Sequence, residues 1–197
     1  MSKQIVLASA SPRRKELLDQ IGVSYSVHPV DIDETPKQSE DPLDYVQRVA
    51  AEKSSACMEI LNTSLPILAA DTSVVIDGCI LGKPENKEHA VAMLNKLSGQ
   101  KHLVYSAVSL RSYGANNECR HFQALSTTEV RFRTINPKEI QAYWQTGEPV
   151  GKAGAYAIQG FASVFVASIS GSFSGVVGLP LFETAELLSK QGIKVIT

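Results

Sequence analysis

The sequence has little cysteine and no long apolar run. Its three cysteines, Cys57, Cys79 and Cys119, are widely spaced and form no C-x-x-C pair, which is typical of reduced thiols in a cytosolic protein. No apolar run approaches the roughly 18 residues of a membrane-spanning helix, and the apolar segment near the N-terminus is too short for a secretory signal. We therefore expect a cytoplasmic protein with no membrane partner.

An excess of charge of one sign is also missing, because 19 Lys and Arg residues face 20 Asp and Glu residues and the net charge is -1. This balance argues against a broad basic surface for nucleic acid, so any phosphate affinity should be confined to a pocket. The four histidines show no metal-ligand spacing and no zinc signature. The glycine-rich residues 171–178 lack the G-K-[ST] ending of a P-loop.

What is present is an ordinary globular composition, with 44% hydrophobic and 20% charged residues in 197 positions. That length is enough for one sizeable core and does not require a second domain. We expect residues 1–197 to form a single domain.

The beginning of the chain is its most informative stretch. Residues 4–8 predict a buried strand, and Pro12 with Ser11 before it predicts a helix that runs to about residue 20. Arg13 and Arg14 occupy the first turn of that helix, where the helix dipole is already positive. A bound phosphate chain would offset these charges. The alternative is a capped surface helix with solvated arginines.

An acidic loop follows the extended residues 23–30 and contains Asp31, Asp33 and Glu34. Carboxylates grouped in this way suit Mg²⁺ or Mn²⁺, although a solvated acidic loop is the simpler interpretation. A second helix should begin with Asp41 as its N-cap and Pro42 at its first position. Lys53 falls on the apolar stripe of that helix (Leu43, Val46, Ala50, Cys57, Ile60). It is either a snorkelling lysine or a phosphate ligand.

Residues 66–70 predict a buried strand that ends in Asp71, Thr72 and Ser73. Asp77-Gly78 predicts a hairpin immediately afterwards, and Lys83 lies on the turn that follows it. Chemistry in α/β folds is often placed at the end of a buried strand. Asp71 at such a position needs a partner from elsewhere in the chain, either a metal or a lysine.

The remaining elements are predicted less sharply. We expect helices over residues 86–97, 137–146 and from residue 181 onward, and two antiparallel extended segments, 102–111 and 121–133, around a turn at 113–117. Residues 151–160 are rich in glycine and alanine and contain one amide side chain, Gln159. So many small residues indicate that the backbone here lies close to a strand or a ligand. Residues 161–169 read as a strand and residues 171–178 as a glycine loop.

Five segments in order resemble the Maf nucleotide pyrophosphatases, also called septum formation inhibitors. They are L-A-S-A-S-P-R-R at 7–14, A-A-D-T-S-V-V at 69–75, L-G-K-P at 81–84, K-A-G-A-Y-A-I-Q-G at 152–160 and V-V-G-L-P-L at 176–181. The fourth segment is similar to the branch that acts on dTTP and UTP. The resemblance implies an α/β fold with a mixed, curved central sheet flanked by helices, two lobes with a cleft between them, and a homodimer.

The resemblance also implies roles for individual residues. Asp71 corresponds to the proton acceptor of the family, and Glu34 with Asp71 would hold a divalent cation, Mg or Mn. The substrate-binding positions would be Arg13, Arg14, Lys53, Thr72, Lys83 and Gln159. The implied reaction hydrolyses dTTP and UTP to the nucleoside monophosphate and diphosphate. A role implied for this reaction is the removal of non-standard nucleotides. The alternative is a non-catalytic nucleotide-binding regulator of cell division.

Overall fold

A mixed seven-stranded sheet forms the centre of the computed structural model, which describes residues 3–114 and 116–195. The strands are β1 (Ile5–Leu7), β2 (Tyr25–Val27), β3 (Ile67–Ile76), β4 (Cys79–Leu81), β5 (Lys101–Tyr113), β6 (Cys119–Phe132) and β7 (Val166–Ser170). Their order is β2-β1-β3-β5-β6-β7, with β4 paired to β3. β1 runs parallel to β2 and β3, and the other pairs are antiparallel.

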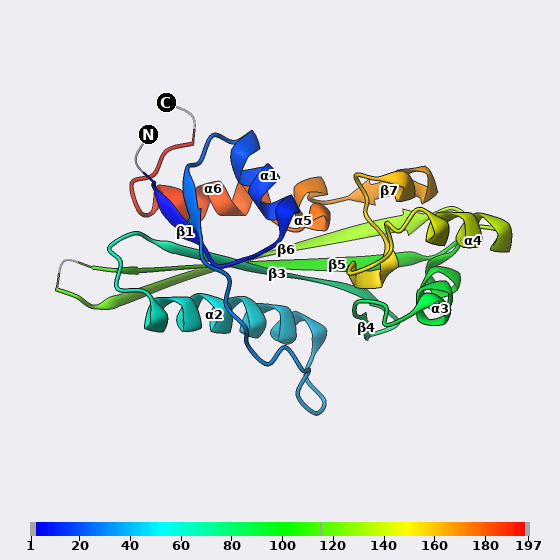
Figure 1. The fold of residues 1–197 in the computed structure, drawn as a ribbon, viewed down its shortest axis with the longest axis horizontal. Helices are drawn as coiled ribbons and strands as arrows, with labels where there is room; N and C mark the ends of the chain where they lie inside the picture. Colours follow the sequence, from blue (N-terminus) through cyan, green and yellow to red (C-terminus); the bar gives the residue numbers. More distant parts are fainter. Residues whose placement is uncertain (1–2, 115, 196–197) are drawn as a thin grey trace.

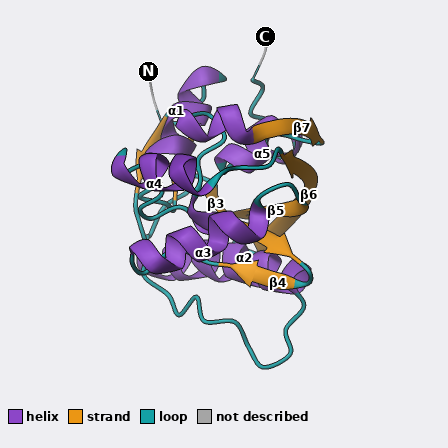
Figure 2. Ribbon diagram, turned by 90° about the vertical axis from the view of Figure 1, so that its right-hand side faces the viewer, coloured by secondary structure: helices purple, strands orange, loops and turns teal. Residues whose placement is uncertain are grey.

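Helices cover both faces of this sheet (Figure 1). They are α1 (Pro12–Gln20), α2 (Pro42–Ile60), α3 (Lys87–Leu97), α4 (Pro137–Gln145), α5 (Phe173–Val177) and α6 (Leu181–Ser189), with the 3₁₀ turns η1 (Ala153–Ala155) and η2 (Phe161–Phe165). α2 lies on one face and α1, α5 and α6 lie on the other, an arrangement also visible in the turned view of Figure 2. The predicted α/β fold with a mixed sheet between helices is therefore confirmed. Within the described residues no helix is long and apolar enough to cross a membrane.

The starts of α2 and α4 follow the capping residues that the sequence indicated. The side chain of Asp41 accepts a hydrogen bond from the backbone N–H of Leu43, and Asn136 accepts one from that of Glu139. Each bond satisfies one of the N–H groups that a helix leaves without an internal partner. The apolar stripe of α2 packs on the sheet through Val46, Ala50 and Cys57, as expected, but Ile60, the last residue of the helix, is exposed.

The prediction that the buried strand ends before Asp71 is wrong. β3 continues through Asp71, Thr72 and Ser73 to Ile76, and Asp71 is paired with Ala107 of β5 in the middle of a long antiparallel ladder. The ladder satisfies the backbone groups of these polar residues, so the strand has no reason to stop. The hairpin at Asp77-Gly78 is confirmed, since Ile76 pairs with Cys79 across it.

The hairpin between the two longest strands is confirmed as well. β5 and β6 pair antiparallel over their whole length, from Lys101 with Arg131 to Tyr113 with Cys119. Of the predicted turn at 113–117, Ala115 lies outside the described residues.

Two predictions for the last third are wrong in their local conformation. Residues 161–165 form the 3₁₀ turn η2, not a strand, because the carboxylate of Glu148 accepts hydrogen bonds from the backbone N–H groups of Phe161 and Ala162. Of the strand predicted at 161–169, only residues 166–169 are extended, as part of β7. The glycine-rich residues 171–178 contain the short helix α5, whose first turn is capped by Ser172 through the N–H of Gly175.

Candidate active site

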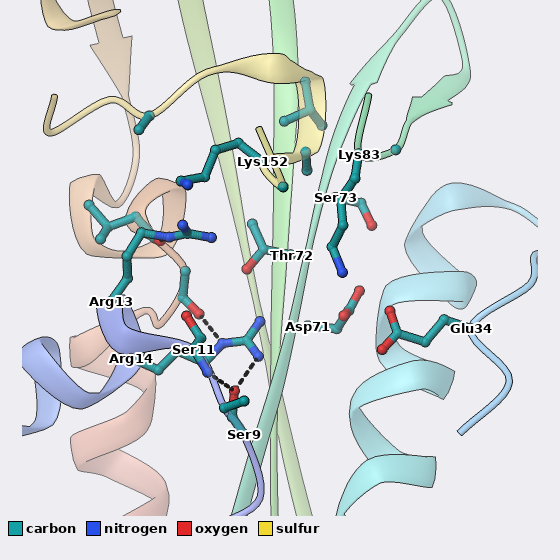
Figure 3. A pocket seen from close by; sticks show the side chains of 18 of the residues that line it. Ser9, Ser11, Arg13, Arg14, Glu34, Asp71, Thr72, Ser73, Lys83 and Lys152 are labelled. Atoms are coloured by element: carbon teal, nitrogen blue, oxygen red, sulfur yellow. Dashed lines mark hydrogen bonds between the residues drawn. The ribbon is translucent and has the colours of Figure 1, made fainter. Parts of the chain in front are cut away.

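A cleft of about 670 Å³ lies between two groups of elements. One wall comes from the β1–α1 junction and the end of α5, and the other comes from β3, the turn after β4, and residues 150–159. Every residue that the sequence predicted for the site lines this cleft: Arg13, Arg14, Glu34, Lys53, Asp71, Thr72, Lys83 and Gln159. The fold therefore brings together side chains from widely separated parts of the chain (Figure 3).

Lys53 connects the two acidic residues of the cleft. Its ammonium nitrogen lies 2.9 Å from Oδ1 of Asp71 and 2.9 Å from Oε1 of Glu34. Lys53 and Asp71 are both buried, whereas Glu34 is partly open to solvent. A buried lysine or aspartate is costly unless its charge is paired. The lysine partner that Asp71 needed is thus Lys53, which reaches it from α2 and does not snorkel to solvent.

The loop that carries Glu34 is fastened to α2. The hydroxyl of Tyr45 donates a hydrogen bond to the backbone carbonyl of Glu34 at 2.9 Å, and Arg48 donates one to the carbonyl of Thr35. Burial acts to raise the pKa of Glu34, but the hydrogen bond and charge of Lys53, followed by the charges of Lys83 and Arg14, lower it below its ordinary value. Glu34 is therefore held as a carboxylate at the cleft.

The two arginines of α1 bind backbone carbonyls at the end of α5. Nε of Arg13 donates to the carbonyl of Val177 at 3.2 Å, and Nε of Arg14 donates to that of Gly178 at 2.9 Å. These carbonyl dipoles offset part of the positive charge at the start of α1. The guanidinium of Arg14 also donates to Oγ of Ser9, while the predicted cap by the Ser11 side chain is not formed.

Burial lowers the pKa of both arginines from the usual value, and the charge of Asp71 opposes this shift at Arg14. A guanidinium has five N–H donors, so each arginine keeps donors for a ligand beyond those it gives to the protein. The interpretation of this turn as an anion site is favoured over solvated surface arginines.

Thr72 faces away from Asp71 on β3, because successive residues of a strand point to opposite sides of a sheet. Its Oγ1 lies 2.9 Å from Oγ of Ser106, and Ser106 donates its own hydrogen to the carbonyl of Gly175 at 2.6 Å. Since Ser106 has only one hydrogen to give, Thr72 is the donor between the two hydroxyls. The lone pairs of the Thr72 oxygen are left to accept a bond from a ligand.

Lys83 and Gln159 have no side-chain partner within the described part of the chain. Lys83 is exposed on the turn after β4, and Figure 3 shows its ammonium directed toward Asp71. Gln159 lies exposed at the cleft on the segment that follows η1. Both side chains are free to meet a ligand.

Sequence reasoning missed two residues that shape this site. Lys152 lines the cleft, and Glu148 holds the segment around Gln159 by accepting hydrogen bonds from Tyr143, Phe161 and Ala162. A lysine within a run of small residues was a signal for the first. Nothing local marked Glu148, because the two backbone N–H groups that it holds lie 13 and 14 positions ahead in the chain.

The turn before Gln159 requires glycine at residue 154. Gly154 has φ of +65°, and a Cβ there would lie 2.9 Å from Cγ1 of Val74. Its N–H donates to the carbonyl of Gly82 at 3.1 Å, next to Lys83. This turn therefore packs closely against β3 and against the turn after β4, both of which line the cleft.

A family model described as "Maf-like protein" matches residues 4–191. The chain belongs to the Maf family. Among curated relatives, the "dTTP/UTP pyrophosphatase" of Methylococcus capsulatus is 52% identical over 190 residues, which cover 96% of this chain and 92% of the relative. The relative of the same name from Nitrosomonas europaea is 53% identical, with 97% and 96% covered. That from Colwellia psychrerythraea is 47% identical, with 97% and 90% covered.

The Maf cleft offers a limited set of ligands for a metal. Within the described residues no group of three or more His, Cys, Asp or Glu side chains could hold a metal ion. Asp71 and Glu34 each give one oxygen to Lys53, which leaves Oδ2 and Oε2 without a partner in the described part of the chain. Mg²⁺ commonly binds one or two protein carboxylates and completes its shell with substrate phosphates and water. The donor set fits a divalent cation of this kind.

Proposed function

We propose that this Maf protein hydrolyses dTTP and UTP to the nucleoside monophosphate and diphosphate. We also propose that it removes non-standard nucleoside triphosphates by the same reaction. The observation that carries the proposal is the Lys53-bridged pair of Asp71 and Glu34 in a cleft that also exposes Arg13, Arg14 and Lys83. The names of relatives about half identical over nearly the whole chain support the same reaction.

Binding of the triphosphate falls to the cations of the cleft. Lys83 has no ion pair within the described residues, and Arg14 has spare donors beside the N–H groups of the first turn of α1. Both are suited to phosphate oxygens, Arg14 through its planar fork and Lys83 as a point charge. The ammonium of Lys53 is bonded to Asp71 and Glu34. Lys53 therefore acts on the phosphates indirectly, by positioning these two carboxylates.

Asp71 serves as the proton acceptor in this scheme. A water oxygen attacks the α-phosphorus, its proton passes to a carboxylate oxygen of Asp71, and the bond from the α-phosphorus to the bridging oxygen breaks to release diphosphate. Lys53 orients the Asp71 carboxylate by binding Oδ1, which leaves the lone pairs of Oδ2 for the attacking water and for a cation. A divalent cation, when bound by Asp71 and Glu34, supplies charge neutralisation and polarises the phosphate.

The decisive experiment is incubation of the purified protein with dTTP, UTP, CTP, dATP and GTP in Mg²⁺ or Mn²⁺, followed by chromatography of the products. Formation of monophosphate and diphosphate from dTTP and UTP is expected. Release of nucleoside diphosphate and inorganic phosphate would overturn the proposed bond. Nucleotide binding without any turnover would instead point to a regulator of cell division.

We further propose that residues 1–197 act as one unit in the cytoplasm, as a homodimer and without nucleic acid. All three cysteines lie within the described residues and are free thiols, which supports a reducing compartment. Large apolar side chains exposed near the C-terminal third support self-association, namely Phe161, Val164, Phe173 and Phe182. Sedimentation analysis of the purified protein tests the dimer.

A further inference from the structure

Lys152 is a cation of the cleft that the proposed reaction does not use. Its ammonium donates to the backbone carbonyl of Val150 at 3.2 Å, and it has no ion pair with a carboxylate in the described part of the chain. Burial, and then the charge of Arg13, lower its pKa below the ordinary value. Figure 3 shows Lys152 and Arg13 directed toward each other from opposite walls. The space between them is therefore lined by hydrogen-bond donors from both sides.

Arg13 contributes more than one donor to this space. Only its Nε is used within the described residues, in the bond to the carbonyl of Val177. The two terminal nitrogens have no partner there, and they form a planar edge with fixed directions. Such an edge can read acceptor oxygens that lie in the plane of a flat ring.

The two ends of the cleft differ in their charged groups. Asp71, Glu34, Lys53 and Lys83 gather at one end, which matches the phosphorus under attack and its cation. The other end carries Lys152 and Arg13, and the acidic side chains that line the cleft do not lie there. Since Asp71 must be next to the α-phosphorus, the end with Lys152 and Arg13 is left for another part of the nucleotide.

Uracil and thymine have an edge that suits donors of this kind. Each presents two carbonyl oxygens on either side of one N–H, whereas cytosine has an amino group in place of O4. Lysine and arginine can donate but cannot accept a hydrogen bond. At the position of O4, the amino group of cytosine would therefore meet another hydrogen-bond donor, and neither group could accept a bond from the other.

Gln159 on the same segment cannot make this distinction. Its amide presents a donor on one side and an acceptor on the other, and rotation by half a turn lets it pair with either base. Discrimination between uracil and cytosine needs a neighbouring group whose polarity is fixed.

We propose that Lys152 is a specificity-determining residue that donates a hydrogen bond to O4 of uracil or thymine and thereby disfavours cytosine, which has an amino group at that position. Arg13 faces the same edge from the opposite wall. This inference rests on the proposed pyrophosphatase function, and it adds a base-reading role for a residue of the 150–160 segment.

The test compares kcat/KM for UTP and CTP in the wild type and in Lys152→Gln, Lys152→Met and the matched surface control Lys138→Met. Lys138 is exposed on α4 and does not line the cleft. Glutamine can rotate to suit either base, so Lys152→Gln should reduce the preference for UTP over CTP by roughly tenfold or more, the scale of one hydrogen bond to a charged group. Lys152→Met should lower UTP turnover, and Lys138→Met should leave the UTP preference unchanged.

The outcomes separate this inference from the function on which it depends. An inactive wild type would overturn the pyrophosphatase proposal itself. An equal loss of kcat/KM for all triphosphates in both Lys152 variants would assign Lys152 to the phosphates and overturn the base-reading role, as would an unchanged UTP preference. Inhibition of the wild type and Lys152→Gln by UMP and CMP repeats the comparison without the diphosphate, and the same narrowing of selectivity is expected.

Discussion

The ammonium of Lys53 and the carboxylate of Asp71 form a buried ion pair, with Nζ 2.9 Å from Oδ1, between α2 and the middle of β3. The same ammonium reaches Glu34 at an equal distance. One lysine thus holds both carboxylates of the site in place. Its removal should affect stability and catalysis by separate routes.

Lys53→Met should destabilise the protein by about 3–5 kcal/mol, because it leaves Asp71 buried with its charge unpaired. Chemical denaturation measures this loss. The double variant Lys53→Met/Asp71→Asn removes the unpaired charge and should recover part of the stability. A double variant no more stable than Lys53→Met would show that the pair does not carry the effect.

The same variant should change the pH dependence of turnover. The pKa of Glu34 is lowered, against the effect of its burial, chiefly by the hydrogen bond and charge of Lys53. Without Lys53 this pKa rises, so Glu34 becomes protonated at a higher pH. We expect the acid limb of the kcat/KM profile to move to higher pH, because the proposed reaction uses the ionised Glu34 carboxylate.

Asp71→Asn should lose turnover by about two to four powers of ten, since the amide is a far poorer proton acceptor. The variant should remain folded, because the asparagine oxygen can still accept from Lys53 and Glu34 keeps its own bond. Affinity for nucleotide without metal should hold or rise, as the cleft becomes less negative. Diphosphate release and calorimetric titration of one preparation check both. Near wild-type turnover would remove Asp71 from the mechanism.

Gln159→Ala should change the relative kcat/KM for UTP and GTP while leaving the melting temperature unchanged, because the side chain is exposed and has no partner in the described part of the chain. Steady-state kinetics with both nucleotides measure the ratio. If that ratio stays constant, Gln159 has no role in base selection.

Gly154→Ala should destabilise the protein by about 1–3 kcal/mol, since φ is +65° and the new Cβ would contact Val74 at 2.9 Å. Val74→Ala in the same chain removes the steric part and leaves the cost of the left-handed backbone. Thermal unfolding of the two single variants and the double variant separates these terms. Strictly additive losses would show that the close contact is not felt.

His102 should make stability sensitive to acid. It is buried, donates to or accepts from the hydroxyl of Tyr156, and burial lowers its pKa to about 4. The unfolded chain binds a proton at His102 near pH 6.5 and the folded one does not until about pH 4, so stability is full above pH 6.5 and falls as the pH drops through this window. The free energy of unfolding should therefore be about 3 kcal/mol lower below pH 4 than above pH 6.5.

His102→Gln removes this titration and should flatten the stability curve between pH 6.5 and pH 4. Denaturant titrations at closely spaced pH values measure the slope for both proteins. Parallel slopes would mean that another group dominates acid sensitivity.

Local signals predicted much of the fold. Pro12 at the start of α1, Asp41 and Asn136 as caps, and Asp77-Gly78 in a hairpin act on their immediate neighbours, so sequence alone identified them. The strand that continues through Asp71 was missed, because its polar residues are stabilised by pairing with β5 about 36 positions away.

The site was predictable as a set of residues but not as a geometry. All the residues expected from the family resemblance line one cleft. That Lys53 binds Asp71 and Glu34, and that Glu148 holds η2, depends on packing between distant elements. Residues 161–165 look like a strand by composition, and only the long-range bonds of Glu148 make them a 3₁₀ turn.

The hydrogen bonds from Arg13 to Val177 and from Arg14 to Gly178 each join residues 164 positions apart. During synthesis, the arginines leave the ribosome long before the carbonyls that position them. At elongation rates of about 5–20 residues per second, the wait is roughly ten to thirty seconds. A nascent or truncated chain that stops before residue 177 therefore lacks both carbonyls that position the two arginines.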